Sequence, residues 1–389
     1  MFKIRTLNNI SVLGLERLPR DRYEVASEIQ HPDAILLRSY KMHDMEIPAS
    51  LKAVGRAGAG VNNIPVDKMS KLGIPVFNAP GANANAVKEL VVAGMLMAAR
   101  NIPQAWDFAR KLEGDDATLN KLVEAGKKDF VGFEIAGRTL GVIGLGAIGV
   151  KVANAAIALG MKVIGYDPQL TVQSAWKLHH DVQKANSVDE LVMRSDFISL
   201  HIPETETTKN LINAQRLNNA RKGVVICNFA RGGIVDTAAL MAQLKAGKVH
   251  AYVCDFPANA LKDHPRVIAL PHLGASTEEA EDNCAVMVAD QVRDYLENGN
   301  IVNAVNFPEV AMPRAEGGVR IAIANSNVPN MVGQISTAMA KAELNIIDMI
   351  NKSRGDIAYT LVDVNKAVPA TVVKQISVID GVLAVRVLD

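Results

Sequence analysis

The stretch LGVIGLGAIG, residues 140–149, decides the fold of the middle of this chain. Its first half has the continuous Val/Ile/Leu character of a buried parallel strand. Its second half repeats glycine in the pattern G-x-G-x-x-G at the start of a helical segment. In this pattern the first glycine makes a tight turn, the second admits a pyrophosphate close to the backbone, and the third lets helix and strand pack closely. The stretch predicts a dinucleotide-binding turn made of Gly144, Gly146, Ala147, Ile148 and Gly149.

Further apolar runs follow on both sides of this turn, with helical patterns between most of them. Near-continuous Val/Ile/Leu runs joined by helical crossovers are typical of a parallel sheet covered on both faces. The fold class is therefore α/β, with a doubly wound parallel sheet whose strands are predicted at residues 139–144, 162–167, 196–201, 223–228, 251–255 and 266–270.

The second of these predicted strands ends in an acid, Asp167. A carboxylate at this place can accept hydrogen bonds from ribose hydroxyls, and the following residues, PQL, carry no cation that would compensate a 2′-phosphate. The cofactor is therefore expected to be NAD rather than NADP. Glycines can also serve tight packing in any βα turn, but the strand, the helix and the acid together favour a dinucleotide site.

Composition excludes several classes of protein. The 42 Lys and Arg residues balance 41 Asp and Glu residues, so no global charge favours nucleic acid or an anionic membrane. The longest apolar runs are too short to cross a bilayer, and the N-terminus lacks a signal-peptide core. Three cysteines, Cys227, Cys254 and Cys284, lack metal-ligand spacing and are interpreted as reduced thiols of a cytoplasmic protein without a metal site.

The flanking regions predict further domains. Small βα units are expected from 34 to 79, a long helix from 85 to 102, and an amphipathic helix from 276 to 299. The pattern of apolar and polar residues over 319–389, the tail of the chain, predicts a βαββαβ module. We predict a substrate domain in 1–94 that returns in 283–310, an NAD-binding domain in 95–282, and a small C-terminal domain in 318–389.

Two side chains with suitable chemistry follow predicted strands of the nucleotide domain, Arg231 and His272. In open α/β sheets, ligands collect at the carboxyl ends of the strands. A guanidinium there can hold a substrate carboxylate, and an imidazole can take the proton of a hydroxyl as a hydride leaves. Either residue alone could be a surface ion pair or a structural histidine; their joint position beside a nucleotide site favours oxidation of a 2-hydroxy acid.

The chain resembles the D-isomer-specific 2-hydroxyacid dehydrogenases in RAGAGVNNI, GIPVFNAPGAN, LGVIGLGAIG, NFARGGIVD, PHLGAST and NGNIVNAVNFP. The resemblance implies a discontinuous substrate domain and NAD-dependent oxidation of 3-phosphoglycerate to 3-phosphohydroxypyruvate, which begins the phosphorylated route to L-serine. It implies that Arg231 binds the substrate carboxylate and that His272 is the acid/base. It also implies that Phe229, Ala230 and Asp255 lie along the cofactor.

The same resemblance assigns the other anionic groups of the substrate. Arg38, Ser39 and Asn83 match residues at the phosphorylated end, and Gly58 lies in a loop that meets the carboxylate. Lys127 and Lys128 occupy the place where a dimer partner lends a basic side chain, although both could be solvated charge. The tail, 319–389, resembles an ACT domain, an amino-acid-sensing module, with Asn327 and Asn345 as candidate L-serine ligands. A homodimer or homotetramer is implied, without nucleic-acid or membrane partners.

The chain departs from the family where a glutamate should stand behind His272. Alignment on Phe256 and Pro257 puts Asn259 at that position. An asparagine can fix the imidazole tautomer but supplies no charge. Either Asn259 or a carboxylate from Asp263 could orient His272, and the sequence leaves this choice open.

Two other functions remain open at this point. One is a reductase of another 2-hydroxy acid, such as glyoxylate or hydroxypyruvate. The other is a non-catalytic protein that senses NAD or an amino acid, which the missing glutamate would favour.

Overall fold

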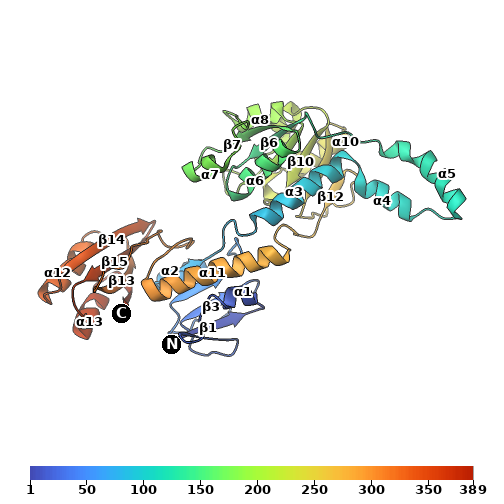
Figure 1. Ribbon diagram of the computed structural model, residues 1–389. Coiled ribbons are helices and arrows are strands. Elements are labelled where there is room, and N and C mark those ends of the chain that lie inside the picture. The colour runs from blue at the N-terminus through green and yellow to red at the C-terminus, as the bar shows by residue number, and fades with distance from the viewer. Residues whose placement is uncertain (389) are drawn as a thin grey trace. The chain divides into compact units, whose positions relative to one another are not determined.

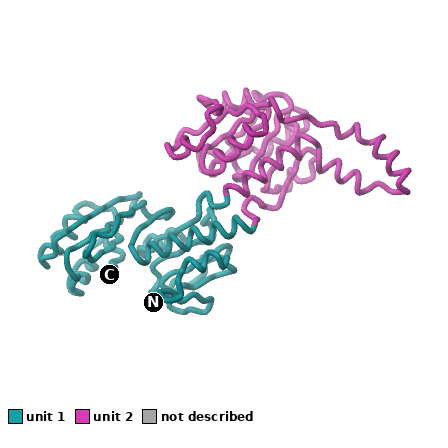
Figure 2. Tube along the Cα trace, viewed as in Figure 1, with its two compact units in different colours: residues 1–83, 278–389 teal, residues 84–277 magenta. Residues whose placement is uncertain are grey.

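The computed structural model describes residues 1–388, whose contacts divide the chain into two compact units. Unit 1 consists of residues 1–83 and the chain from 278 onward, and unit 2 consists of residues 84–277 (Figure 2). The predicted boundaries at 94/95 and 282/283 would cut helices α3 (Ala84–Ala99) and α11 (Glu278–Asn298). The structure keeps both whole, because α3 packs on the sheet of unit 2 and α11 on a sheet of unit 1. None of the helices in the described residues combines the length and the apolar character of a transmembrane span.

Unit 2 is a doubly wound α/β domain, which confirms the predicted fold class. Its parallel sheet has the strand order β12-β11-β10-β9-β6-β7-β8. After β6, the strands β7 and β8 are added on one side and β9 to β12 on the other, as in dinucleotide-binding domains. Its elements are β6 (Thr139–Ile143), α6 (Ala147–Ala158), β7 (Lys162–Tyr166), α7 (Val172–Lys177), β8 (Gln183–Lys184), α8 (Val188–Arg194), β9 (Phe197–Leu200), α9 (Ala214–Asn219), β10 (Val224–Asn228), η2 (Gly232–Ile234), α10 (Thr237–Lys245), β11 (Val249–Cys254) and β12 (Val267–Ala269).

The alternation of side chains along these strands builds a core on each face of the sheet. Val225 and Val253 join the core beneath α3 and α6. Ile226 and Cys254, one position further along, join the core beneath α8, α9 and α10. Because successive strand residues point to opposite faces, both faces are apolar and both are covered by helices. Each fully buried aliphatic side chain contributes about 1.5–3 kcal/mol to this packing.

A two-helix arm interrupts unit 2 between α3 and β6. The helix predicted over 85–102 ends at Ala99, so that prediction is wrong at its end: Asn101 adopts φ 49° in the left-handed region, and a new helix, α4 (Ile102–Arg110), follows. Every residue of α4 and of α5 (Asp116–Gly126) is at least partly exposed. A 3₁₀ turn, η1 (Lys127–Phe130), ends the arm, which projects from the sheet (Figure 1).

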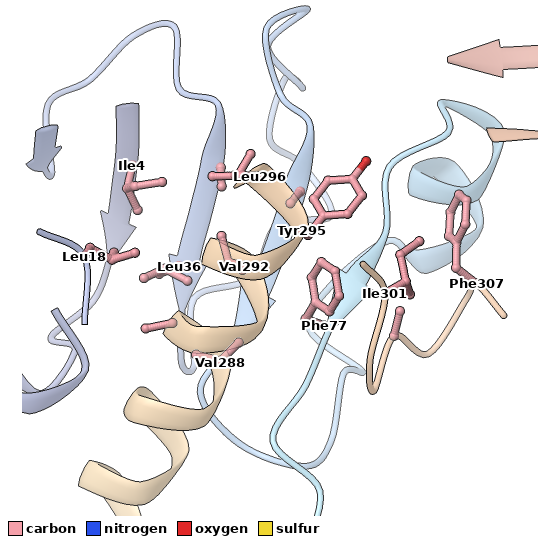
Figure 3. Close-up of a cluster of buried hydrophobic side chains, with 14 of the residues drawn as sticks. Ile4, Leu18, Leu36, Phe77, Val288, Val292, Tyr295, Leu296, Ile301 and Phe307 are labelled. Carbon is pink, nitrogen blue, oxygen red and sulfur yellow. The ribbon is translucent and has the colours of Figure 1, made fainter. Parts of the chain in front are cut away.

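The first part of unit 1 is a five-stranded parallel sheet in the order β2-β1-β3-β4-β5. Helix α11 packs on it through Val288, Val292 and Leu296, and the ring of Tyr295 lies 5.6 Å from that of Phe77 (Figure 3). Such a close approach depends on a glycine in the strand beneath. A Cβ added at Gly55 of β4 would lie 2.8 Å from Val288. The other elements are β1 (Phe2–Leu7), α1 (Val12–Leu15), β2 (Tyr23–Ala26), β3 (Ala34–Leu37), β4 (Ala53–Arg56), α2 (Val66–Lys71) and β5 (Val76–Phe77).

The C-terminal module of unit 1 has the predicted βαββαβ order. Its antiparallel sheet runs β14-β15-β13-β16, the ferredoxin-like arrangement. Ile321 and Ile323 face the module's own helices, whereas Ala322 and Ala324 join the core around α11. The sheet therefore lies between its helices and the rest of unit 1. Its elements are β13 (Val319–Ser326), α12 (Met331–Lys341), β14 (Ile346–Arg354), β15 (Ile357–Val364), α13 (Ala370–Ser377) and β16 (Val382–Leu388).

The C-terminal module also caps the end of α11. A helix leaves its last four carbonyls without intrahelical partners, and cations near that end interact favourably with the helix dipole. Here arginines and a tyrosine of the module and its linker donate to these groups: Arg386 to the carbonyls of Tyr295 and Leu296, Arg314 to Glu297, Arg320 to Asn298, and the Tyr359 hydroxyl to Gly299.

Arg320 is the most buried of these groups, with 0% side-chain exposure. It forms two hydrogen bonds with Asp363, Nε to Oδ1 at 2.7 Å and Nη2 to Oδ2 at 2.8 Å. Its remaining N–H groups donate to main-chain carbonyls, including that of Met312 at 2.7 Å. Burial alone would raise the pKa of Asp363, but the hydrogen bonds from Arg320 and from the Ala315 N–H hold that pKa below its usual value. The pair joins the module to the linker before it.

Candidate active site

The glycine turn after β6 has the geometry that the motif predicts. Gly144 adopts φ 91°, in the region that favours glycine. A Cβ at Gly149 would collide with the carbonyl oxygen of Gly144, so the third glycine permits the close start of α6. A Cβ at Gly146 would point into open space. Ala147 and Ile148 form the first turn of α6, whose free N–H groups are suited to a phosphate.

A pocket of about 360 Å³ lies beside this turn, within unit 2. Asp167 lines it at the end of β7. Its Oδ2 accepts a hydrogen bond from the Leu145 N–H at 2.8 Å, and its Oδ1 accepts one from the Gln169 N–H at 2.8 Å. Each carboxylate oxygen keeps a second lone pair for a ribose hydroxyl. The apolar lining, which includes Leu178 and Val182, suits the adenosine half of a dinucleotide.

Arg231 follows β10 at the same carboxyl edge, and a buried asparagine shapes its turn. Asn228 accepts from the Ala230 N–H through Oδ1 at 3.2 Å and donates through Nδ2 to the Arg231 carbonyl at 2.9 Å. The Arg231 side chain is exposed, and its Nη1 donates to the Ala230 carbonyl at 2.6 Å. The Phe229 side chain, by contrast, is buried in the core of unit 2. It packs against α3, where a Cβ added at Gly94 would lie 3.0 Å from its ring.

His272 follows β12, two strands from Arg231 in the sheet. The chain past β12 continues beside the end of β11: Leu270 N–H donates to the Cys254 carbonyl at 2.8 Å, and His272 N–H to the Asp255 carbonyl at 3.0 Å. His272 adopts φ 42°, an uncommon conformation for a residue with a Cβ. Its imidazole is exposed and lies 4.9 Å from the ring of Phe256.

Asp255 is 1% exposed and lies inside this turn. Its Oδ2 accepts from the Gly274 N–H at 3.1 Å, and its Oδ1 is buried without a hydrogen-bond partner among residues 1–388. Burial raises the pKa of Asp255, against the opposing effects of the Gly274 hydrogen bond and of the charges on His272 and Arg231. The sequence placed Asp255 along the cofactor but gave no sign of its proximity to both catalytic candidates.

The two candidate replacements for the missing glutamate are both exposed. Asn259 and Asp263 lie on the segment between β11 and β12. In the described part of the chain, no hydrogen bond links either side chain to the His272 ring. His201, at the end of β9, is the other histidine of this edge; burial lowers the pKa of His201 to about 3, so its ring is neutral and bonds to Ser199 Oγ at 2.8 Å.

The candidate residues for the substrate's anionic groups lie in unit 1. Arg38 and Ser39 follow β3, and Gly58 follows β4, at the carboxyl edge of that sheet. Arg56, the last residue of β4, was not among the residues predicted from the sequence. Its guanidinium covers Gly58, and its Nε donates to the Arg38 carbonyl at 3.1 Å. Asn83, the last residue of unit 1 before α3, is half-buried.

Lys127 and Lys128 lie apart from Arg231 and His272 within unit 2. They line a pocket of about 630 Å³ with Arg100, past the C-terminal end of α3. The N-terminal end of α3 lies near the turn that carries His272, because a Cβ added at Gly274 would lie 3.4 Å from the Val87 side chain. A helix of 16 residues spans about 24 Å, so one copy of the chain keeps the lysines distant from that turn. Lys127 also pairs with Glu124.

Asn327 and Asn345 lie at opposite ends of the C-terminal sheet. Asn327 follows β13 and donates to the Gly355 carbonyl at 3.0 Å, at the β14–β15 turn. Asn345 precedes β14, and its N–H donates to Asn365 Oδ1 at 3.0 Å, beyond the other end of β15. The structure of one chain does not bring these asparagines together.

One group of potential metal ligands occurs in the described residues, His179, His180 and Asp181, with ligand atoms within 4.8 Å of one another. All three belong to one exposed loop after α7. The Nδ1 of His179 already accepts a hydrogen bond from the Asp181 N–H at 3.2 Å, so this lone pair is occupied.

The chain is similar to several known proteins over most of its length. Residues 92–274 match the family described as D-isomer specific 2-hydroxyacid dehydrogenase, NAD binding domain. The chain is 36% identical over 355 residues to D-3-phosphoglycerate dehydrogenase of Methanocaldococcus jannaschii, covering 88% of this chain and 64% of the relative. It is 34% identical to the Haemophilus influenzae protein of the same name, covering 88% of this chain and 83% of that protein. The chain thus spans less than two thirds of the first relative.

A solved structure is also similar. The NAD⁺-bound 3-phosphoglycerate dehydrogenase of Entamoeba histolytica superimposes with a TM-score of 0.61 at 26% identity, covering 78% of this chain and 98% of that protein. The match to the NAD binding domain confirms the predicted cofactor. With its identity to the Haemophilus relative over most of both lengths, the chain belongs to the D-isomer-specific 2-hydroxyacid dehydrogenase family.

Proposed function

We propose that this chain oxidises 3-phosphoglycerate to 3-phosphohydroxypyruvate, with NAD as the oxidant. The observation that carries the proposal is that Arg231, Asp255 and His272 follow consecutive neighbours in one sheet, β10, β11 and β12, at the edge that also carries the glycine turn. The names of the two relatives support this choice of substrate. The reaction would begin the phosphorylated route to L-serine.

The residues of unit 2 fit NAD on three counts. The outer side of Gly146 is open to a pyrophosphate, and Asp167 has lone pairs for the ribose. The buried Oδ1 of Asp255 is an acceptor that has no donor among residues 1–388, which suits the amide of a nicotinamide ring. NAD, when bound, supplies the ring that accepts the hydride.

The side chains at the edge supply the remaining chemistry. The Arg231 guanidinium holds the substrate carboxylate and polarises the neighbouring C2 oxygen. The neutral imidazole of His272 takes the proton of the C2 hydroxyl as the hydrogen on C2 leaves with its electron pair, so that the C2–O bond becomes a carbonyl. In the reverse direction the imidazolium returns the proton. Exposure of the His272 ring leaves it accessible to substrate.

The residues that we propose as ligands of a phosphate belong to unit 1. Arg38 and Arg56 place two guanidinium groups around the loops that follow β3 and β4. Ser39 and Gly58 add hydrogen-bonding groups nearby in sequence, and Asn83 is a further candidate at the end of this segment. Arginine suits phosphate because its fork makes paired hydrogen bonds. The second cation is an argument for a doubly charged phosphate over the smaller anions of glyoxylate or hydroxypyruvate.

The assembly that we propose is a homodimer built by the arm of unit 2. Trp106 is 61% exposed, and Ile102, Leu122 and Val123 are also exposed on α4 and α5. Exposed apolar side chains on a projecting pair of helices are typical of a dimer interface. A partner arm would also provide the basic side chains of Lys127 and Lys128 to a neighbouring substrate.

The C-terminal module supports a second pairing and an L-serine effector site. Strand β14 is an edge of its sheet and has an unpaired side. If β14 pairs antiparallel with β14 of another copy, the start of one strand meets the end of the other. Asn345 of one copy then lies beside Asn327 of the partner, which joins the two asparagines that a single chain keeps apart.

Formation of NADH, followed by absorbance at 340 nm, tests the proposed reaction. We expect turnover with 3-phosphoglycerate and NAD, and a KM for D-glycerate that is at least about tenfold higher, since charge-assisted hydrogen bonds are worth about 1.5–3 kcal/mol. Equal use of the two substrates would favour the reductase of an unphosphorylated 2-hydroxy acid. NAD binding without turnover of any of these acids would favour the sensing protein.

A further inference from the structure

The loop after β3, residues 38–40, carries two of the candidate phosphate ligands of unit 1. Its place is set by the sheet: β1 and β3 are parallel neighbours, with Leu7 opposite Leu37 in the register. Asn8, the first residue past β1, therefore emerges beside the first residue of the loop. The side chain of an asparagine at this edge is short enough to bond to the neighbouring main chain.

The Asn8 side chain accepts two main-chain donors of the loop. Its Oδ1 accepts the Ser39 N–H at 3.1 Å and the Tyr40 N–H at 2.6 Å. An amide oxygen has two lone pairs, so these two bonds use its accepting capacity. Asn8 adopts φ 74°, in the left-handed region that asparagine tolerates better than most residues with a Cβ. The residue type thus suits both the backbone and the contact.

Asn63 holds the carbonyl groups of the same loop. Its Nδ2 donates to the Arg38 carbonyl at 3.1 Å and to the Tyr40 carbonyl at 2.8 Å, which uses both of its N–H groups. The Arg38 carbonyl also accepts from Arg56 Nε at 3.1 Å. The Oδ1 of Asn63 is buried without a hydrogen-bond partner among residues 1–388, so the bonds that the amide donates determine its orientation.

We propose that Asn8 and Asn63 are positioning residues for phosphate recognition, which hold the loop 38–40 in the conformation that binds the substrate's phosphate. The proposal rests on the proposed function and adds residues that act through Arg38 and Ser39. The four bonds use main-chain groups of the loop, so they do not occupy the Arg38 guanidinium or the Ser39 hydroxyl. A loop that is already held loses little conformational entropy when a ligand binds.

A positioning role and a purely structural role differ in what their loss changes. Removal of bonds that only stabilise unit 1 lowers the free energy of unfolding and leaves the KM values of the folded enzyme unchanged. Removal of bonds that position the loop raises the KM for a phosphorylated substrate. The KM for D-glycerate, which has no phosphate, then stays at its wild-type value.

Asn8→Gly is the first variant to test, because glycine keeps the left-handed backbone without strain and removes the accepting side chain. We expect the KM for 3-phosphoglycerate to rise about five- to thirtyfold, the cost of ordering about one backbone residue, with kcat and the KM for D-glycerate unchanged. Asn330→Gly is the matched control: Asn330 also has a left-handed backbone, φ 63°, but precedes α12 in the C-terminal module, and its substitution should change neither KM.

Amide hydrogen exchange measures the hold on the loop directly, without substrate. Exchange of the Ser39 and Tyr40 amides should become faster in Asn8→Gly. It should stay slow in Asn8→Asp, whose carboxylate accepts the same two N–H groups and whose backbone tolerates the left-handed region. Asn63→Ala should raise the KM for 3-phosphoglycerate in the same direction. Asn8 is exposed, so its variants keep the test available if Asn63→Ala fails to fold.

Three results would overturn the proposal. The first is unchanged exchange of the two amides in Asn8→Gly. The second is faster exchange in this variant with an unchanged KM for 3-phosphoglycerate. The third is an equal rise of the KM for 3-phosphoglycerate and for D-glycerate, which would indicate a general disturbance of unit 1.

A failure of the proposed function can be distinguished from a failure of this inference. If the wild type turns over no 2-hydroxy acid, the proposed function fails, and the exchange of the two amides still decides whether Asn8 holds the loop. Calorimetric titration with inorganic phosphate then tests the ligand. Weaker binding by Asn8→Gly than by the wild type and Asn330→Gly would support the inference, and equal or absent binding in all three proteins would overturn it.

Discussion

Arg38 and Glu281 form an ion pair within unit 1, with Nη2 of Arg38 2.6 Å from Oε1 of Glu281. Arg38 follows β3 among the candidate phosphate ligands, and Glu281 lies in the first turn of α11. A substrate phosphate that binds Arg38 would compete with this carboxylate for the guanidinium. We therefore expect the pair to weaken binding of a phosphorylated substrate.

Substitution of Glu281 by Gln should accordingly tighten binding of the phosphorylated substrate. Because both side chains are partly exposed, the pair is worth at most about 1 kcal/mol, and we expect a two- to fivefold lower KM for 3-phosphoglycerate with an unchanged kcat. Asp290→Asn, which removes another acid of α11 paired with Arg17, is the control and should leave KM unchanged. An unchanged or higher KM in Glu281→Gln would remove Arg38 from the phosphate site.

Asp167 should determine both the affinity for NAD and the preference against NADP. Its carboxylate is held by the N–H groups of Leu145 and Gln169, in position for ribose hydroxyls. In Asp167→Ala we expect the KM for NAD to rise about tenfold or more, because a hydrogen bond to a charged group is worth about 1.5–3 kcal/mol. The KM for NADP should not rise. Asp181→Asn, at an exposed acid of the loop after α7, should change neither constant; a parallel loss of NAD and NADP would contradict this role.

The buried pair of Arg320 and Asp363 should control the stability of unit 1. Arg320→Met leaves a buried carboxylate without its cation and should lower the free energy of unfolding by about 3–5 kcal/mol, measured in urea at pH 7. The double variant with Asp363→Leu should recover most of this loss, since no unpaired charge remains. A double variant whose free energy of unfolding is no higher than that of Arg320→Met would contradict this prediction.

The same pair has a predictable pH dependence. The pKa of Asp363 lies below its ordinary value of 3.8, so the folded state binds protons less readily than the unfolded one. The contribution of the pair to stability is therefore complete above that value and is lost as the pH falls further, through the lowered pKa. Urea unfolding of the wild type and of Arg320→Met should converge below pH 3.8, because a protonated Asp363 no longer requires the cation.

The arm should form the dimer interface. Trp106 is 61% exposed on α4, and Trp residues are frequent among the side chains that dominate interfaces. Trp106→Glu should weaken dimerisation at least about tenfold in sedimentation experiments, since a central interface Trp is commonly worth 2 kcal/mol or more. Trp176→Glu is a matched control, because Trp176 is 85% exposed but lies on α7, outside the arm. Equal effects of the two substitutions would contradict this interface.

Much of the fold could be predicted from local pattern. The glycine turn and its flanking apolar runs determine the doubly wound sheet, because periodicity and glycine spacing are properties of short segments. The arm could not be predicted from the same pattern: the helical periodicity continues to residue 102, and only the left-handed backbone of Asn101 shows the break. Neither α4 nor α5 has a buried residue, so the apolar pattern in this segment does not mark a core.

The candidate site was predictable only in part. Arg231 and His272 could be found because each directly follows an apolar strand, and the same rule applied to β4 would have found Arg56. The relationship of Asp255 to His272 could not, because it depends on how residues 270–274 continue beside β11. Neither could the capping of α11 by arginines, which are distant in sequence from the helix end.

The most direct test of the central claim compares NADH formation from 3-phosphoglycerate by the wild type and by His272→Asn at saturating NAD. Asparagine keeps the backbone conformation but takes no proton, and general acid–base catalysis contributes about 10²–10⁴-fold. We predict turnover by the wild type and a kcat lower by at least about 10²-fold in the variant, with NAD binding retained. A wild-type enzyme that forms no NADH from 3-phosphoglycerate, or a variant with the wild-type kcat, would contradict the account.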